Sequence, residues 1–167
     1  GLHDGPRGTN LLDSGAPFYD VYRCADGEWV SVAAIEKKFR AVLIERLRAA
    51  GADVQGLPDF DERARWPELR ARLAAAFARQ PRAHWCAALE GSDACFAPVL
   101  APRAAPGHPH HVARGSFLTV DGVTQPAPAP RFSATPSGLP MAPDGAGDAR
   151  AWALAWGVGA DELQALD

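Results

Sequence analysis

The segment Phe18–Glu36 constrains the fold most, because it contains two strand-like runs and leads directly into a helical pattern. The runs Tyr19–Cys24 and Trp29–Ala33 are rich in β-branched and aromatic residues, and they flank the dipeptide Asp26-Gly27. An Asp-Gly pair tolerates the positive φ angles of a type I′ turn, which predicts a β-hairpin. Odd-numbered residues of 29–33 should then share one face of the strand, and the even-numbered residues the other.

The hydrophobic period changes immediately after this hairpin. Phe39, Leu43 and Leu47 recur every four residues, which predicts a helix over residues 36–50. Glu36 lies at the junction of strand and helix, where rigid elements hold its side chain and the helix N-terminus favours its ionised form. Glu36 is therefore a candidate acid/base residue, although a glutamate that only complements the helix dipole would have the same position.

The remaining pattern predicts an α+β fold. Its predicted elements are helices at 67–79 and 81–89, a strand at 95–100, a loop at 101–115, a second Asp-Gly hairpin at 116–125, and tail helices at 148–156 and 160–166. The hairpins and the strand should form one small, mostly antiparallel sheet with three helices on one face. We expect a linker at 1–15, a small α+β domain at 16–132, and an extended linker with a C-terminal helical tail at 133–167.

Composition argues against several classes of protein. The net charge is −3 and no basic run occurs, so we expect no nucleic-acid partner. No apolar run approaches the length of a membrane span, so we expect no membrane association. Cys24, Cys86 and Cys95 are odd in number and lack CxxC spacing, which indicates reduced thiols and a cytoplasmic location.

Several short motifs follow one another in a fixed order along most of the chain. They are Gly8–Asp13, Gly15–Tyr19, Ala25–Gly27, Ala34–Glu36, Ser92–Leu100, Arg114–Phe117 and Pro128–Ser133. In this order and spacing, the motifs resemble those of the α-methylacyl-CoA racemases, which belong to the family III CoA-transferase superfamily. The resemblance implies an enzyme of fatty acid metabolism that epimerises C2 of 2-methyl-branched acyl-CoA thioesters by 1,1-proton transfer.

The resemblance also implies roles for individual residues. Glu36 would be catalytic, pointing from the small domain into the active site and forming a hydrogen bond with the histidine that exchanges the α-proton. Leu12, Tyr19 and Ile35 would line the acyl pocket, and ordinary packing is the alternative interpretation of each. No cofactor is expected, because the substrate carries CoA, and no metal site is expected.

The family places its proton-exchanging histidine and aspartate, and most of its CoA site, in a large domain. We therefore expect this chain to be a C-terminal small-domain fragment of a longer enzyme, inactive alone, whose full-length form is a homodimer. Two alternatives stay open: the small domain of a family III CoA-transferase, and a non-catalytic binding or assembly module of the same fold. A glycine-rich loop in place of Ala34–Glu36 would favour the transferase.

Histidines cluster at His108, His110 and His111. Histidine is a common metal ligand, but no acidic or cysteine partner is suitably spaced. A solvated loop is the expected interpretation.

Overall fold

The computed structural model describes residues 5–140 and 149–164. The chain separates into two compact units, Gly1–Ala101 and Pro102–Asp167, which are described individually below. The expected domain boundaries after residues 15 and 132 stay a prediction. Residues 148, 165 and 166 of the predicted tail helices lie outside the described residues.

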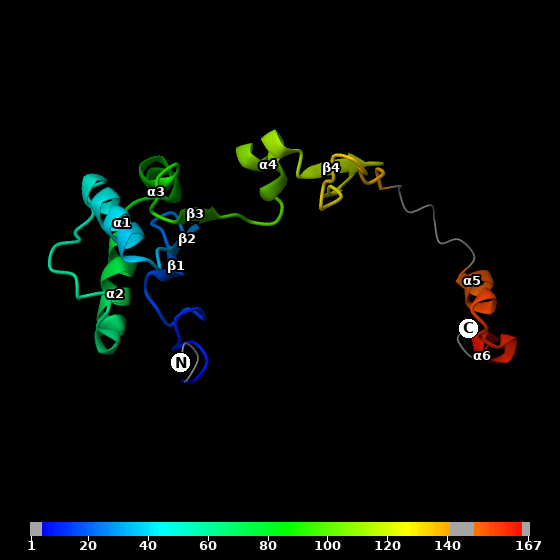
Figure 1. Ribbon diagram of the computed structural model, residues 1–167, viewed down its shortest axis with the longest axis horizontal. Coiled ribbons are helices and arrows are strands. Elements are labelled where there is room, and N and C mark those ends of the chain that lie inside the picture. The colour runs from blue at the N-terminus through cyan, green and yellow to red at the C-terminus, as the bar shows by residue number, and fades with distance from the viewer. Residues whose placement is uncertain (1–4, 141–148, 165–167) are drawn as a thin grey trace. The chain divides into compact units, whose positions relative to one another are not determined.

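The first unit contains a three-stranded antiparallel sheet (Figure 1). Its strands are β1 (Tyr19–Arg23), β2 (Trp29–Ala33) and β3 (Phe96–Val99), in the order β1-β2-β3. Pro98 in β3 has no N–H to donate, which suits a strand at the edge of a sheet. The predicted hairpin and the predicted third strand are confirmed.

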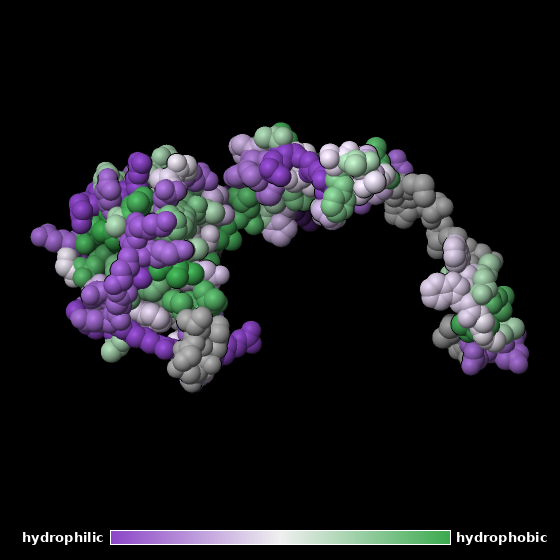
Figure 2. Space-filling view, viewed as in Figure 1, coloured by the Kyte–Doolittle hydropathy of each residue, from purple (hydrophilic) through white to green (hydrophobic). Residues whose placement is uncertain are grey.

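Three helices cover one face of this sheet. They are α1 (Lys37–Ala49), α2 (Trp66–Phe77), preceded by the 3₁₀ turn η1 (Arg63–Arg65), and α3 (Arg82–Leu89). Val30 and Val32 are buried under the helices and Trp29 is exposed, so these residues lie on opposite faces of the strand, as the alternating pattern predicted. Hydrophilic residues dominate the outer surface of the helices in Figure 2. The α+β fold class is thus confirmed.

Aromatic packing fills the centre of the first unit. The ring of Phe77 stacks on Tyr22 at 5.1 Å and meets the edge of Trp85 at 5.3 Å between centroids. The indole N–H of Trp85 donates to the Phe77 carbonyl at 2.9 Å, so this buried polar group is satisfied. Leu43 and Leu47 of α1 complete the core, which confirms the helical stripe.

The two Asp-Gly turns differ. In the second hairpin, Asp121 and Gly122 both have positive φ, 47° and 82°, as a type I′ turn requires. In the first hairpin only Gly27 has a positive φ, and its N–H donates to the Cys24 carbonyl at 3.0 Å. The predicted type I′ turn is therefore wrong there, because a longer loop places a single residue in the left-handed region.

The second unit has its own two-stranded sheet. Its elements are η2 (Ala105–Gly107), α4 (Pro109–Arg114), β4 (Phe117–Val120), β5 (Val123–Pro126), α5 (Ala149–Ala155) and α6 (Ala160–Gln164). The strands β4 and β5 pair with each other, so the expectation of one sheet containing both hairpins is wrong.

The short helix α4 occupies part of the predicted 101–115 loop. Pro109 stands at its first position, where a missing N–H costs nothing, and Gly115, with a φ of 54°, terminates it. The guanidinium of Arg131 donates to the Gly115 carbonyl at 2.8 Å and also to the Arg114 carbonyl. Arg131 thereby holds the end of this helix.

Candidate active site

Glu36 is the N-cap residue of α1. Its backbone is extended, with φ −80° and ψ 144°, and its carbonyl accepts the N–H groups of Phe39 and Arg40, both at 3.0 Å. The side chain is exposed, and within the described residues its carboxylate has no hydrogen bond or ion pair. Rigid elements on both sides hold a carboxylate that is available to a further group.

Asp61 forms ion pairs with two basic residues near this helix end. It binds Lys37 at 2.7 Å and Arg40 at 2.8 Å, and the first turn of α1 has no acidic residue. The hydrogen bonds from Lys37 and Arg40 lower the pKa of Asp61, and the bond to Asp61 raises the pKa of Lys37. Asp61 thus pairs with both cations, and among the residues that the structure describes Glu36 forms no salt bridge.

Cys95 lies within electrostatic range of Glu36. Partial burial, and then the negative charges of Glu36 and Asp93, raise the pKa of the Cys95 thiol. A thiolate is the nucleophilic form of cysteine, so a raised pKa disfavours nucleophilic chemistry at this position.

The other predicted site residues fall into two places. Tyr19, half-buried on β1, is the register partner of Ala33 on β2. Ile35, also half-buried, donates its N–H to the Ala33 carbonyl at 2.9 Å. Tyr19, Ile35 and Glu36 therefore belong to the same end of the sheet. Leu12 lies in the preceding loop with its side chain 44% exposed.

That loop has an internal hydrogen-bond network, although its sequence suggested a linker. The side-chain amide of buried Asn10 donates to the Asp13 carboxylate at 2.8 Å, and the Gly8 N–H donates to the same oxygen at 2.9 Å. The guanidinium of Arg70 on α2 donates to the Gly15 carbonyl at 3.0 Å. These bonds give the chain a defined path into β1.

The same network predicts a pH dependence of the loop. The hydrogen bond from Asn10, with others from the backbone N–H groups of Gly8 and Asn10, lowers the pKa of Asp13 from 3.8 to about 2. Because the pKa of Asp13 is lower in the folded chain than its ordinary value of 3.8, ionised Asp13 stabilises the folded loop above pH 3.8. This stabilisation is lost as the pH falls toward 2 and the carboxylate becomes protonated. We expect the amide of Gly8 to lose protection from hydrogen exchange over this window. In Asp13→Asn its protection should be lower at neutral pH and vary less with pH.

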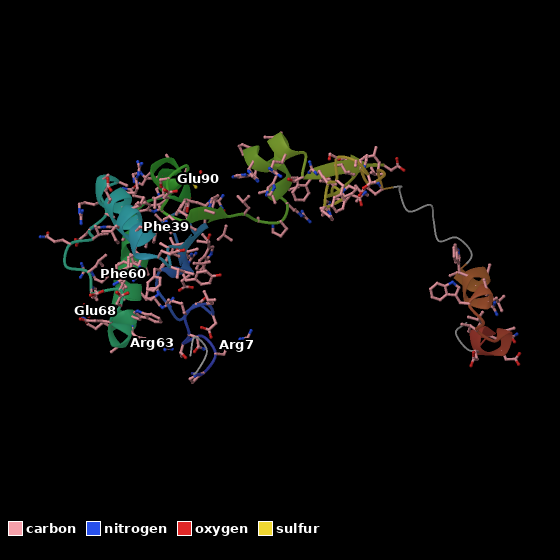
Figure 3. All side chains as sticks on the ribbon, viewed as in Figure 1. Arg7, Phe39, Phe60, Arg63, Glu68 and Glu90 are labelled. Atoms are coloured by element: carbon pink, nitrogen blue, oxygen red, sulfur yellow. The ribbon has the colours of Figure 1, made fainter. Side chains whose placement is uncertain are left out.

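A cavity of about 390 Å³ lies between this loop and the start of α2. It is lined by Gly8, Thr9, Gly15, Arg63, Trp66, Pro67 and Arg70. Arg63, beside α2 in Figure 3, lies over the Trp66 ring with its guanidinium carbon 5.5 Å from the centroid. The predicted acyl-pocket residues do not line this cavity.

The histidine cluster belongs to the second unit. The ring of His111 contacts His108 at 5.8 Å, His110 at 5.5 Å and Phe117 at 5.5 Å between centroids. In the part of the chain that the structure describes, no group of three or more histidine, cysteine, aspartate or glutamate side chains could hold a metal ion.

Sequence reasoning missed Arg40 and Asp61, which surround the start of α1. The position of Arg40, four residues after Glu36, places it one turn along the same helix, and this spacing was a usable signal. Asp61 gave no such signal, because it lies in an irregular loop that reaches the helix only through tertiary packing.

Comparisons with known proteins point to one family. The profile of CoA-transferase family III matches residues 2–147. The chain is 45% identical over 139 residues to α-methylacyl-CoA racemase of Mus musculus, covering 82% of this chain and 35% of the relative. It is 42% identical over 137 residues to the human protein of the same name, covering 81% and 35%. The chain thus spans about a third of the length of these curated relatives.

A solved structure agrees with the fold. A mutant of Rv3272 from Mycobacterium tuberculosis superimposes with a TM-score of 0.58 at 19% identity, over 80% of this chain and 38% of that chain. No helix within residues 5–140 and 149–164 is long and apolar enough to cross a membrane.

Proposed function

This chain belongs to CoA-transferase family III, and on that premise we propose that it is the small-domain portion of an α-methylacyl-CoA racemase. The reaction is epimerisation at C2 of a 2-methyl-branched fatty acyl-CoA by 1,1-proton transfer. Sequence identity of 42–45% with two α-methylacyl-CoA racemases supports this assignment over other activities of the family.

The chemistry requires two proton-exchanging groups. The thioester carbonyl acidifies the α-hydrogen, one base removes it to give an enolate, and an acid returns a proton to the other face. We assign these groups to a histidine and an aspartate of a large domain, as in the family that the chain resembles. The substrate carries its own CoA, so the proposed reaction uses no separate cofactor.

Glu36 is the contribution of this chain to catalysis. The observation that carries the proposal is its exposed carboxylate at the start of α1, which has no hydrogen bond or ion pair within the described residues. Such a carboxylate can accept a hydrogen bond from the histidine, fix its tautomer and stabilise the imidazolium. Tyr19 and Ile35, at the same end of the sheet, together with Leu12, would line the acyl pocket.

The proposal includes partners and a location. The large domain completes the active site, the complete enzyme forms a homodimer, and its substrate is an acyl-CoA. The three cysteines are free, which agrees with a reducing, cytoplasmic location.

A hybrid enzyme tests this function directly. In it, the matching 139-residue segment of the mouse relative is replaced by this chain. We expect the hybrid to incorporate deuterium from heavy water at C2 of a 2-methylacyl-CoA, as measured by mass spectrometry. The chain alone should show no exchange above its Glu36→Ala variant. A folded hybrid that does not exchange the α-proton, or an active isolated chain, would overturn the proposal.

A CoA-transferase is the second candidate. The family's own description and a 27% identical CaiB/baiF CoA-transferase family protein from Caenorhabditis elegans favour it. A transferase moves CoA from a thioester to a free carboxylate. Incubating the hybrid enzyme with a labelled carboxylate acceptor therefore distinguishes the two activities. A transferase converts the labelled acceptor into its CoA thioester, whereas a racemase leaves the acceptor as the free carboxylate.

A further inference from the structure

Arg40 contacts both segments that carry the candidate site residues. Its Nη2 donates to the carbonyl of Ile35 at 2.9 Å, and its guanidinium carbon lies 4.6 Å from the ring centroid of Phe18. Ile35 directly precedes Glu36, and Phe18 directly precedes Tyr19. One cation therefore links the end of β2 to the beginning of β1.

The same guanidinium is held from a third direction. Its Nη1 donates to Asp61 at 2.8 Å, and the ring of Phe60, which Figure 3 shows on the loop after α1, lies 5.8 Å from the guanidinium carbon. The Arg40 side chain is only 13% exposed. Its Nε is buried without a hydrogen-bond partner in the described residues, so Nη1, Nη2 and the aromatic contacts fix its position.

The bond to Ile35 acts on the peptide group that joins Ile35 to Glu36. A charge-assisted hydrogen bond to that carbonyl fixes the plane of the peptide. The peptide plane in turn sets the direction in which the Glu36 side chain leaves the backbone. An ion pair at the surface contributes little to the free energy of folding. The pair between Arg40 and Asp61 matters here because it lies beside the candidate catalytic residue.

We propose that Arg40 is a positioning residue, which holds Glu36 in the orientation that meets the catalytic histidine and also holds Phe18, the residue before Tyr19, through its guanidinium. This inference rests on the proposed function. It assigns no contact with the substrate to Arg40. Its effect on the reaction is transmitted through Glu36.

Two variants and a control separate positioning from general stability. Arg40→Met keeps most of the aliphatic stem and removes every hydrogen bond of the guanidinium. Arg40→Lys keeps the charge but cannot bridge Ile35 and Asp61 while stacking on Phe18, because an ammonium lacks the planar fork. Arg46→Met is the matched control, since Arg46 is exposed on the same helix.

In the hybrid enzyme, Arg40→Met should lower kcat by about 10–100-fold, the range of a slightly misplaced catalytic group. KM should stay within about twofold, because only an interaction of the transition state is lost. Arg40→Lys should restore less than half of the lost rate, and Arg46→Met should match the unmodified hybrid. In an enzyme that already has Glu36→Gln, adding Arg40→Met should lower kcat no further, because Arg40 acts through Glu36.

Folding is checked on the isolated chain by circular dichroism and by the carbon-13 resonance of the Glu36 carboxyl, which should shift in Arg40→Met but not in Arg46→Met. If Arg40→Met does not fold, Arg40→Lys carries the kinetic test. Equal rates for Arg40→Met and Arg46→Met, or losses that add to that of Glu36→Gln, would overturn the role of Arg40 alone. A fast Glu36→Gln enzyme would instead overturn the proposed role of Glu36, on which this inference rests.

Discussion

Glu36→Gln should lower the turnover of the hybrid enzyme by about 10–1000-fold. A general acid/base group typically accelerates a reaction by ~100–10,000-fold, and Glu36 supports such a group, the catalytic histidine. Glutamine keeps the size and most of the hydrogen-bonding capacity of glutamate but removes the charge that stabilises an imidazolium. The loss should appear in kcat more than in KM, since this interaction strengthens as the histidine gains its proton. Rates of deuterium incorporation at C2, measured over a range of substrate concentrations, provide both constants.

A purely structural role for Glu36 gives a different result. If the carboxylate only complemented the helix dipole, Glu36→Gln would cost about 0.3–1 kcal/mol of stability and leave the rate nearly unchanged. Glu45→Gln is the matched control, because Glu45 is exposed on the same helix and remote from its N-terminus. Turnover within a factor of two of that control would show that Glu36 has no catalytic role.

Local sequence patterns predicted most of the first unit. The period-two run of β2 placed Val30 and Val32 on one face, which is the buried one, and the spacing of Leu43 and Leu47 predicted the stripe of α1 that is buried. These predictions succeed because each depends on side-chain direction within one element, which backbone geometry fixes. The position of Glu36 at the start of α1 follows from the same two patterns.

The features that the sequence could not predict depend on contacts between distant segments. Asp26 belongs to the first hairpin loop, yet its carboxylate accepts the N–H of Arg82 at 3.0 Å and so caps α3 from 56 residues away. In the second hairpin, the two residues Asp121 and Gly122 connect the strands alone, and there the type I′ prediction holds. The same dipeptide thus occurs in two different turns: it connects β4 and β5 alone, whereas in the longer first loop Asp26 also caps α3.

Phe77→Ala should produce the largest loss of stability, about 3–5 kcal/mol, the usual cost of truncating a buried phenylalanine. Phe77 is fully buried, and its ring contacts Tyr22 of β1 and Trp85 of α3. The truncation leaves a cavity where β1, α2 and α3 meet, so α2 loses its aromatic contacts with Tyr22 and Trp85. The free energy of unfolding of the first unit, measured from the hydrogen exchange of the Leu43 amide in increasing urea, reports this loss.

Phe132→Ala controls for the substitution itself, because it deletes the same atoms from a 58% exposed residue of the second unit. It should change the free energy of unfolding by no more than about 0.5 kcal/mol. A loss below about 1 kcal/mol for Phe77→Ala would contradict a core organised around its ring, since such a small value is typical of a site that collapses or was never fully packed. A large loss for Phe77→Ala alone would show that the sheet and helices that hold Glu36 derive their rigidity from this aromatic centre.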